Sequence, residues 1–320
     1  MAETKHLERI AIIGAGGHVG KPMATALLAT GKHTITALTR TGSTAALPPG
    51  LERVEVDYAD HASLVSALQS RKIQFLIITL SATAPPEIHS AIVRAAADAG
   101  VPYVMPNVYG GDLFHPSTLQ AAEQGDVYTR AALNRCREIE AFPDMSFVAV
   151  VCGFWFEWSL ALGECFFGID IAKKTVTFFD DGRTKLTVST WEQVGRAVAA
   201  LLGLPEGVVR EKFRNGGVYI GSFEISQRDI LDSLNRVLGI TDADWEIRYQ
   251  GTKERREEGL KELAAGDRLG FAKALYARGF LPGGGGNHEM RHNEVLGLKE
   301  EDLDEAVKRT VKMVESGWRP

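Results

Sequence analysis

Cysteine is scarce in this chain of 320 residues, which contains only Cys136, Cys152 and Cys165. No two of them have the spacing of a cysteine-based zinc module or a redox-active pair. They are also too few and too scattered to form the disulfide framework of a small secreted domain. The sequence therefore predicts free thiols in a reducing compartment.

An excess of basic residues is absent as well. Lysine and arginine number 36 against 41 aspartates and glutamates, which gives a net charge of −5 at pH 7. A protein with a broad nucleic-acid-binding face normally shows the opposite balance. We therefore expect a small-molecule partner and no nucleic acid. The sequence leaves the oligomeric state open between a monomer and a homodimer.

Long hydrophobic runs are missing too. The most membrane-like stretch, residues 147–171, is interrupted by Glu157, Glu164 and Asp170. Its uncharged runs stay well short of the roughly 18 residues that a membrane-spanning helix needs. Residues 1–8 are polar and do not resemble a secretory signal. The prediction is a soluble, cytoplasmic protein without a membrane partner.

The first half of the chain alternates between short apolar runs and amphipathic segments. Strands are expected at 9–13, 34–39, 53–57, 74–79, 101–105 and 146–152. Helices are expected at 19–30, 61–70, 86–99 and 119–141, with Asp60 capping the second of them. This alternation predicts βαβ units and so an α/β fold with a Rossmann-type, doubly wound parallel sheet.

The second half is less regular and predicts a smaller C-terminal substrate lobe. Residues 174–179 and 184–188 flank a turn at 180–183 and are expected to form a hairpin. Further helices are expected at 190–202, 227–238, 253–265, 268–278 and 302–316, and further strands at 218–222 and 245–249. The glycine run 283–286 is expected to be a mobile loop. We assign residues 1–153 to an NAD(P)-binding domain, to which strands near 184–222 return, and 154–320 mainly to the substrate lobe.

The strongest motif follows the first expected strand and opens the first helix. It is the segment Gly14-Ala15-Gly16-Gly17-His18-Val19-Gly20. In that context Gly14 permits a tight turn, Gly17 lets a pyrophosphate approach the backbone, and Gly20 lets the helix pack on the strand. The helix N-terminus supplies N–H groups to the phosphates, including those of His18 and Val19. The motif therefore predicts a dinucleotide site.

The residue after the second strand predicts which dinucleotide is bound. Arg40 stands where an acidic residue would hold the ribose hydroxyls of NAD, and no Asp or Glu occurs between Ile35 and Pro49. A guanidinium suits the 2′-phosphate of NADP(H), with Thr39 and Thr41 as neighbouring hydroxyls. A solvated surface arginine is the alternative. Other residues expected to line the cofactor are Tyr58, Thr79, Leu80, Ser81, Pro106, Asn107 and Phe154.

Polar and aromatic side chains follow the later strands, at the edge where ligands bind in open α/β sheets. Asn107 and Tyr109 are candidate catalytic groups, and Tyr109 is also a candidate substrate contact, although turn-forming roles are equally open. An aromatic wall for the substrate is predicted from Trp155, Phe156 and Trp158, with a place in the core as the alternative. No metal site is expected.

These motifs together resemble a known family. The glycine turn, Arg40, the segment Met105–Asp112 and the segment Cys152–Glu157 are similar to the NmrA-like and isoflavone-reductase-like branch of atypical short-chain dehydrogenases. Residues 178–182 and 293–298 resemble its fungal oxidoreductases. The resemblance covers nearly the whole chain. It implies an NADP-binding Rossmann domain, a lobe that closes a substrate cleft, and reduction of aromatic or polyketide-type secondary metabolites.

One departure from that family concerns catalysis. Its reductases carry a lysine on the helix after the fifth strand, and the matching position here is Ala132. Tyr128 is the leading candidate proton donor, but the helix from Tyr128 to Glu140 contains no lysine. Arg130 lies on another face of the helix. The sequence therefore predicts an NADPH-dependent reductase and leaves two alternatives open: a non-catalytic NADP(H) sensor that binds a protein partner, and an isomerase or cyclase.

Overall fold

The computed structural model describes residues 5–81, 84–124 and 126–319. It is built around an eight-stranded sheet with the order β12-β7-β5-β4-β1-β2-β3, in which β6 pairs with β7 and every pairing is parallel. The strands are β1 (Arg9–Ile13), β2 (Thr34–Arg40), β3 (Glu52–Val56), β4 (Phe75–Ile78), β5 (Tyr103–Met105), β6 (Tyr109–Gly110), β7 (Ser146–Val151) and β12 (Gly216–Tyr219).

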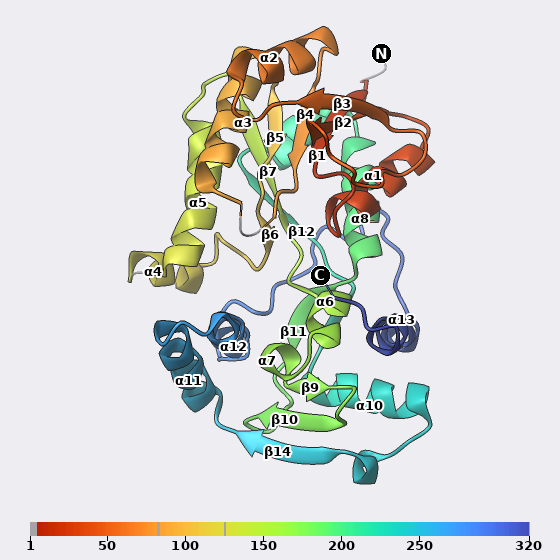
Figure 1. Cartoon of the computed structure of the whole chain (residues 1–320), viewed down its shortest axis with the longest axis vertical. Helices are drawn as coiled ribbons and strands as arrows, with labels where there is room; N and C mark the ends of the chain where they lie inside the picture. Colours follow the sequence, from red (N-terminus) through yellow and green to blue (C-terminus); the bar gives the residue numbers. More distant parts are fainter. Residues whose placement is uncertain (1–4, 82–83, 125, 320) are drawn as a thin grey trace.

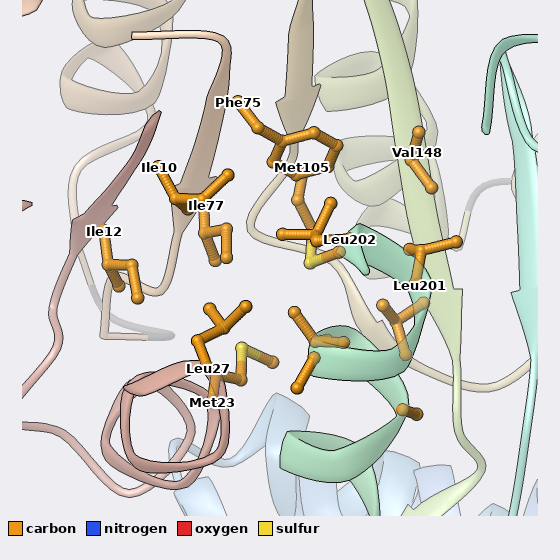
Figure 2. Packing of buried hydrophobic residues seen from close by; sticks show 14 of the residues in the cluster. Ile10, Ile12, Met23, Leu27, Phe75, Ile77, Met105, Val148, Leu201 and Leu202 are labelled. Atoms are coloured by element: carbon orange, nitrogen blue, oxygen red, sulfur yellow. The ribbon is translucent and has the colours of Figure 1, made fainter. Parts of the chain in front are cut away.

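Helices cover both faces of this sheet, because its central strands are apolar on both sides (Figure 1). One face is covered by α1 (Gly20–Ala29) and α8 (Trp191–Leu202). The other is covered by α2 (His61–Ser70), α3 (Pro86–Asp98), α4 (Pro116–Glu123) and α5 (Val127–Glu140). Figure 2 shows the first face, where Met23 and Leu27 of α1 and Leu201 and Leu202 of α8 point toward Ile12 and Ile77 of the sheet.

The second lobe contains two small sheets, of orders β13-β11-β8 and β14-β10-β9, around its own apolar core (Figure 1). Its strands are β8 (Phe154–Trp155), β9 (Ile169–Asp170), β10 (Thr175–Phe179), β11 (Leu186–Ser189), β13 (Phe223–Ile225) and β14 (Glu246–Gln250). Its helices are α6 (Phe156–Ala161), α7 (Glu164–Phe167), α10 (Gln227–Leu238), the 3-10 turn η1 (Asp242–Asp244), α11 (Thr252–Ala264), α12 (Arg268–Gly279) and α13 (Leu303–Glu315). The short helix α9 (Glu206–Lys212) precedes β12 and packs on the core of the large sheet.

The predicted elements of the first half lie within two residues of the observed ones, with one exception. Asp60 caps α2 by accepting hydrogen bonds from the N–H groups of Ala62 and Ser63. The exception is the helix expected at 119–141, which is two helices, α4 and α5. Asp126 caps the second helix by accepting from the N–H of Thr129.

The hairpin expected around residues 180–183 is wrong. β10 pairs with β9 and β14, whereas β11 pairs with β8 and β13, so the two strands belong to different sheets. The turn is real, but the carboxylate of Asp180 accepts hydrogen bonds from the backbone and hydroxyl of Thr252. This tie holds the turn to the start of α11, and the chain crosses from one sheet to the other.

Two glycines of the run 283–286, for which a mobile loop is expected, pack closely against neighbouring backbone. A Cβ on Gly284 would lie 1.9 Å from the carbonyl oxygen of Arg278, and one on Gly286 would lie 2.3 Å from that of Gly279. The Gly286 carbonyl also accepts a hydrogen bond from the Thr187 N–H at 3.1 Å. Glycine is needed here because the backbone passes directly over α12 and β11.

Residues 184–222 divide between the two parts of the molecule. β12 adds to the edge of the large sheet beside β7, and α8 packs against α1 on its face. β11 instead lies in a small sheet of the lobe. Among the helices that the structure describes, none is long and apolar enough to cross a membrane.

A buried ion pair fastens the lobe's helices. Arg255 is 1% exposed and donates to the Glu164 carboxylate at 2.7 Å, while its guanidinium lies 4.4 Å from the centre of the Phe179 ring. Arg255→Ala is expected to lower the free energy of unfolding by about 3 kcal/mol, the low end for breaking a buried pair, because Glu164 is partly exposed and recovers water. Denaturant unfolding measures this loss. Arg256→Ala, which removes a neighbouring cation, is the control, and equal losses would contradict the prediction.

Candidate functional site

The glycine turn between β1 and α1 has the geometry that its sequence predicts. Gly14 has a φ of +83°, and a Cβ there would lie 2.1 Å from the carbonyl oxygen of Thr79. A Cβ on Gly20 would lie 2.3 Å from the carbonyl oxygen of Gly14. Any side chain at these two positions would push α1 away from β1 and β4, so both glycines are required by the fold.

Gly17 differs from those two glycines because the space beside it is open. Its N–H donates to the Gly14 carbonyl at 2.9 Å, which closes the turn. A Cβ on Gly17 would approach only that same oxygen, at 3.3 Å, and Gly17 and His18 are exposed. Within the described chain, no acceptor receives a hydrogen bond from the N–H groups of His18 and Val19. The turn thus offers free donors at a helix N-terminus, which is how proteins hold phosphates.

Aromatic rings from three distant segments surround His18. Its imidazole stacks on Trp191 at the start of α8, with ring centres 5.5 Å apart and an interplanar angle of 19°. Trp158 of α6 and Trp318 beyond α13 meet it edge-on, at 5.8 and 5.4 Å. Trp158 is therefore part of this aromatic cluster around the glycine turn. Trp191 and Trp318 were not expected there, since nothing local in the sequence links them to His18.

Arg40 ends β2 on the same edge of the sheet as the glycine turn. Its side chain is exposed and forms no ion pair with any residue in the described parts of the chain. The charge of Arg40 acts on Tyr58, although burial dominates and raises the pKa of that phenol to about 12. The Tyr58 hydroxyl donates to the Leu38 carbonyl at 3.3 Å, so this half-buried side chain is fixed beside Arg40.

The other residues predicted near the cofactor fall into two groups. Thr39 is 7% exposed, and its hydroxyl faces the Val54 carbonyl at 3.5 Å, so it is turned away from the site that was predicted for it. Thr41 follows at the strand end, where its N–H donates to the Val56 carbonyl. The hydroxyl of Thr79 donates to the Ile13 carbonyl at 2.7 Å, which joins β4 to β1. Leu80 packs partly into the core, and Ser81 is exposed.

The segment after β5 is held from two sides. The N–H of Asn107 donates to Nε2 of His89 at 3.5 Å, and its carbonyl accepts from Nη1 of Arg135 at 3.0 Å. Pro106 is buried beneath it. The hydroxyl of Tyr109 donates to the Ile78 carbonyl at 2.9 Å, and burial raises the pKa of this phenol well above its ordinary value. Tyr109 therefore joins the loop to β4 and does not present a free hydroxyl.

His89 was missed by the sequence reasoning. It is 2% exposed on α3, and Nδ1 lies 3.3 Å from the Glu138 carboxylate, which also accepts from the Ser90 hydroxyl at 2.8 Å. Burial lowers the pKa of His89, although Glu138 opposes that shift. A neutral ring, with Nδ1–H directed at Glu138, leaves Nε2 free to accept from Asn107. Histidine in the middle of a helix gives no local signal of this role.

Tyr128 lies where the two parts of the molecule meet. It is 49% exposed near the start of α5, and its ring centre lies 5.2 Å from that of Phe271 on α12. Beside it, Asp126 forms an ion pair with Arg278 of α12. Desolvation by its neighbours raises the pKa of the Tyr128 phenol, and the charge of Arg135 opposes that shift. The predicted proton donor is thus placed at the junction, with a cation acting on it.

The predicted aromatic wall separates into different environments. Phe154 stacks on Tyr276 of α12, with ring centres 4.2 Å apart, and the Tyr276 hydroxyl lies 2.6 Å from that of Ser159. Trp155 is half-buried against the core of the large sheet. Phe156 is 0% exposed and packs on Phe223, so the prediction that it contacts substrate is wrong. It occupies the core because it opens α6 on that helix's inner side.

Comparison with known proteins supports the resemblance seen in the sequence. Residues 6–117 match the NmrA-like family. Oxidoreductase aprR of Aspergillus flavus is 25% identical over 314 residues, 95% of this chain and 99% of that protein. Oxidoreductase poxI of Penicillium oxalicum is 24% identical over 93% of this chain and 92% of that protein. The predicted resemblance to the NmrA-like proteins and to fungal oxidoreductases is confirmed.

Solved structures confirm the fold. An isoflavone reductase superposes with a TM-score of 0.75 and 20% identity, covering 95% of this chain and 99% of that one. A leucoanthocyanidin reductase from Vitis vinifera, solved with NADPH, superposes with a TM-score of 0.73 and 14% identity over the same shares. The Rossmann-like α/β architecture with a second lobe is therefore that of the isoflavone-reductase-like proteins.

Proposed function

We propose that this chain, which resembles the NmrA-like and isoflavone-reductase-like proteins, is an NADPH-dependent reductase of a small conjugated acceptor of aromatic or polyketide type. The observation that carries the proposal is the pairing of an open glycine turn with an uncompensated Arg40 on one edge of a parallel sheet. Ligands bind at that edge in open α/β folds. Relatives named as oxidoreductases support the reaction class.

The residues at this edge fit NADP(H). The N–H groups of His18 and Val19 would hold the pyrophosphate, and Gly17 leaves room for it. Arg40 would hold the 2′-phosphate, because its guanidinium has no carboxylate partner within the described ranges. The bound cofactor would supply hydride from its nicotinamide. Solved neighbours carrying NADP⁺ or NADPH support this assignment.

The chain's own residues would handle orientation and the proton. Asn107, held between His89 and Arg135, fixes the loop after β5. Tyr128 would donate its phenolic proton to the substrate oxygen as negative charge develops there. The ion pair between Asp126 and Arg278 joins the start of α5 to α12 beside Tyr128.

The substrate class is inferred from the acid strength of the Tyr128 phenol, the proposed proton donor. A phenol whose pKa is raised is a weak acid, so it best serves a substrate that delocalises negative charge by itself. Conjugated enones and quinones do this, and ordinary ketones do not. Solved neighbours are named as reductases of isoflavones, leucoanthocyanidin and quinones, which supports the choice.

A non-catalytic NADP(H) sensor is the second candidate, favoured by the absence of lysine from residues 128–140. An assay of NADPH oxidation distinguishes the reductase from the sensor. The reductase oxidises NADPH with a quinone or enone, whereas the sensor binds NADPH and oxidises none with any acceptor. Failure to bind NADPH would overturn both.

Arg40→Ala tests the cofactor assignment. Because a charge-assisted hydrogen bond contributes about 1.5–3 kcal/mol, the variant is expected to bind NADPH roughly tenfold to a hundredfold more weakly. NADH affinity should hardly change, since NADH lacks the 2′-phosphate. Calorimetric titration of both cofactors measures this. Arg94→Ala, which removes an exposed cation on α3, is the matched control. Equal affinity of the unaltered chain for the two cofactors would exclude the role of Arg40.

A further inference from the structure

Arg135 of α5 is a cation without an ion-pair partner among the described residues. Its guanidinium is half-buried, donates to the Asn107 carbonyl at 3.0 Å, and forms no ion pair with any carboxylate in the described residues. Glu138, one turn further along the same helix, is directed to His89. Near Tyr128 the other charges, Asp126 and Arg278, neutralise each other as an ion pair. The positive charge of Arg135 is therefore the net charge that acts on the phenol.

The helix geometry directs the Arg135 side chain toward position 132, where the related reductases carry a lysine. Tyr128 and Arg135 are seven positions apart, which at about 100° per residue puts them on nearly the same face, two turns apart. Side chains on a helix point toward its N-terminus, so the long arm of Arg135 extends back toward the turn that carries Ala132 and Tyr128. Ala132 lies one turn from Tyr128 on the same helix and is 5% exposed, within the core beneath α5.

We propose that Arg135 has two tasks: it fixes the loop after β5 through the Asn107 carbonyl, and it supplies the positive charge, in place of a lysine at position 132, that keeps Tyr128 acidic enough to donate a proton. Arg135 acts through Asn107 and Tyr128 and is a positioning residue. This inference rests on the proposed function, because its catalytic part concerns the proton that Tyr128 donates. The guanidinium suits the place because its several N–H groups allow it to hold the carbonyl and still direct charge at the phenol.

Three variants separate this role from a structural one. Arg135→Gln removes the charge and Arg135→Lys keeps it. Arg137→Gln removes an exposed arginine of the same helix, whose side chain makes no hydrogen bond or ion pair within the described residues. With a quinone acceptor, Arg135→Gln is expected to lower kcat about tenfold to a hundredfold, with the KM for NADPH little changed. Arg135→Lys should recover most of that loss, and Arg137→Gln should match the unaltered chain.

A second measurement needs no turnover. The ultraviolet absorbance of tyrosinate, taken as the difference between each chain and its Tyr128→Phe counterpart, gives the ionisation of Tyr128 alone. Arg135→Gln should move that titration to higher pH, and Arg135→Lys should leave it near its starting place. An unmoved titration in Arg135→Gln overturns the electrostatic half of the proposal, whether or not the chain proves to be a reductase.

The sharpest arm restores the missing residue. In the double variant Ala132→Lys with Arg135→Gln, the new ammonium restores a positive charge one turn from Tyr128 on the same helix, and kcat should recover at least partly from the Arg135→Gln value. Thermal unfolding of each variant shows that it is folded before its kinetics are compared. If the double variant is folded and no faster than Arg135→Gln, and Arg135→Lys also gives no recovery, Arg135 does not serve as the lysine. If the unaltered chain neither binds NADPH nor reduces a quinone, the proposed function fails, and the Tyr128 titration still decides the charge.

Discussion

Tyr128→Phe is expected to lower the turnover of a conjugated acceptor by roughly 10²–10⁴-fold, the usual contribution of one general acid. The substitution keeps the ring that packs on Phe271 and removes only the hydroxyl, and with it the proton to be donated. NADPH affinity should therefore be retained, and the free energy of unfolding should hardly change. Steady-state kinetics with a quinone, together with calorimetric titration of NADPH, measure the two effects separately.

The control for this prediction is Tyr249→Phe, which removes a hydroxyl from a tyrosine that is 68% exposed on β14 of the lobe. It should leave turnover unchanged. Tyr109→Phe tests a structural role. The Tyr109 hydroxyl donates to the Ile78 carbonyl of β4, so its loss should loosen the loop after β5. If Tyr128→Phe turns over at the unaltered rate, Tyr128 packs at the junction and donates no proton.

Gly17→Val is expected to weaken NADPH binding about 100-fold or more without unfolding the chain. A side chain at Gly17 would stand in the open space before the helix N-terminus, where the pyrophosphate is expected. Losing one or two charge-assisted hydrogen bonds, at about 1.5–3 kcal/mol each, accounts for that size. Calorimetry measures the affinity and thermal unfolding checks the fold.

Two matched glycines sharpen the test. Gly207→Val, on α9 where a Cβ would meet nothing within 4 Å, should change neither affinity nor folding beyond a small propensity effect. Gly20→Val should unfold or strongly destabilise the chain, because its Cβ would lie 2.3 Å from the Gly14 carbonyl oxygen. A folded Gly17→Val protein with undiminished NADPH affinity would show that the dinucleotide binds elsewhere.

Local patterns account for what the sequence predicted well. The glycine turn and Arg40 each follow a strand directly, so their positions at the sheet edge depend only on neighbouring residues and on the parallel topology. The cap at Asp60 is equally local, since its side chain accepts hydrogen bonds from N–H groups two and three residues along the chain. The predicted strands of the first half depend on short apolar runs that both faces of the sheet bury.

Contacts between distant segments account for what the sequence missed. Arg135 and Asn107 are 28 residues apart, and their hydrogen bond exists only because α5 packs beside β5. The turn at 180–183 has the composition of a hairpin, yet its flanking strands find better partners in separate sheets. Phe156 belongs to an aromatic run in which neighbouring side chains point in different directions, because α6 begins within that run. These contacts and pairings depend on tertiary packing, and composition and local pattern do not predict them.

The cluster around His18 makes the glycine turn optically visible. Three of the five tryptophans in the chain, Trp158, Trp191 and Trp318, lie within 6 Å of the His18 ring, centre to centre. Indole emission responds to adjacent rings, so displacement of the His18 ring is expected to change the emission of all three tryptophans at once. Trp245, buried in the lobe core, supplies a steady background. The molecule thus carries a built-in reporter at the turn where phosphate is expected, and dinucleotide binding can be followed without a label.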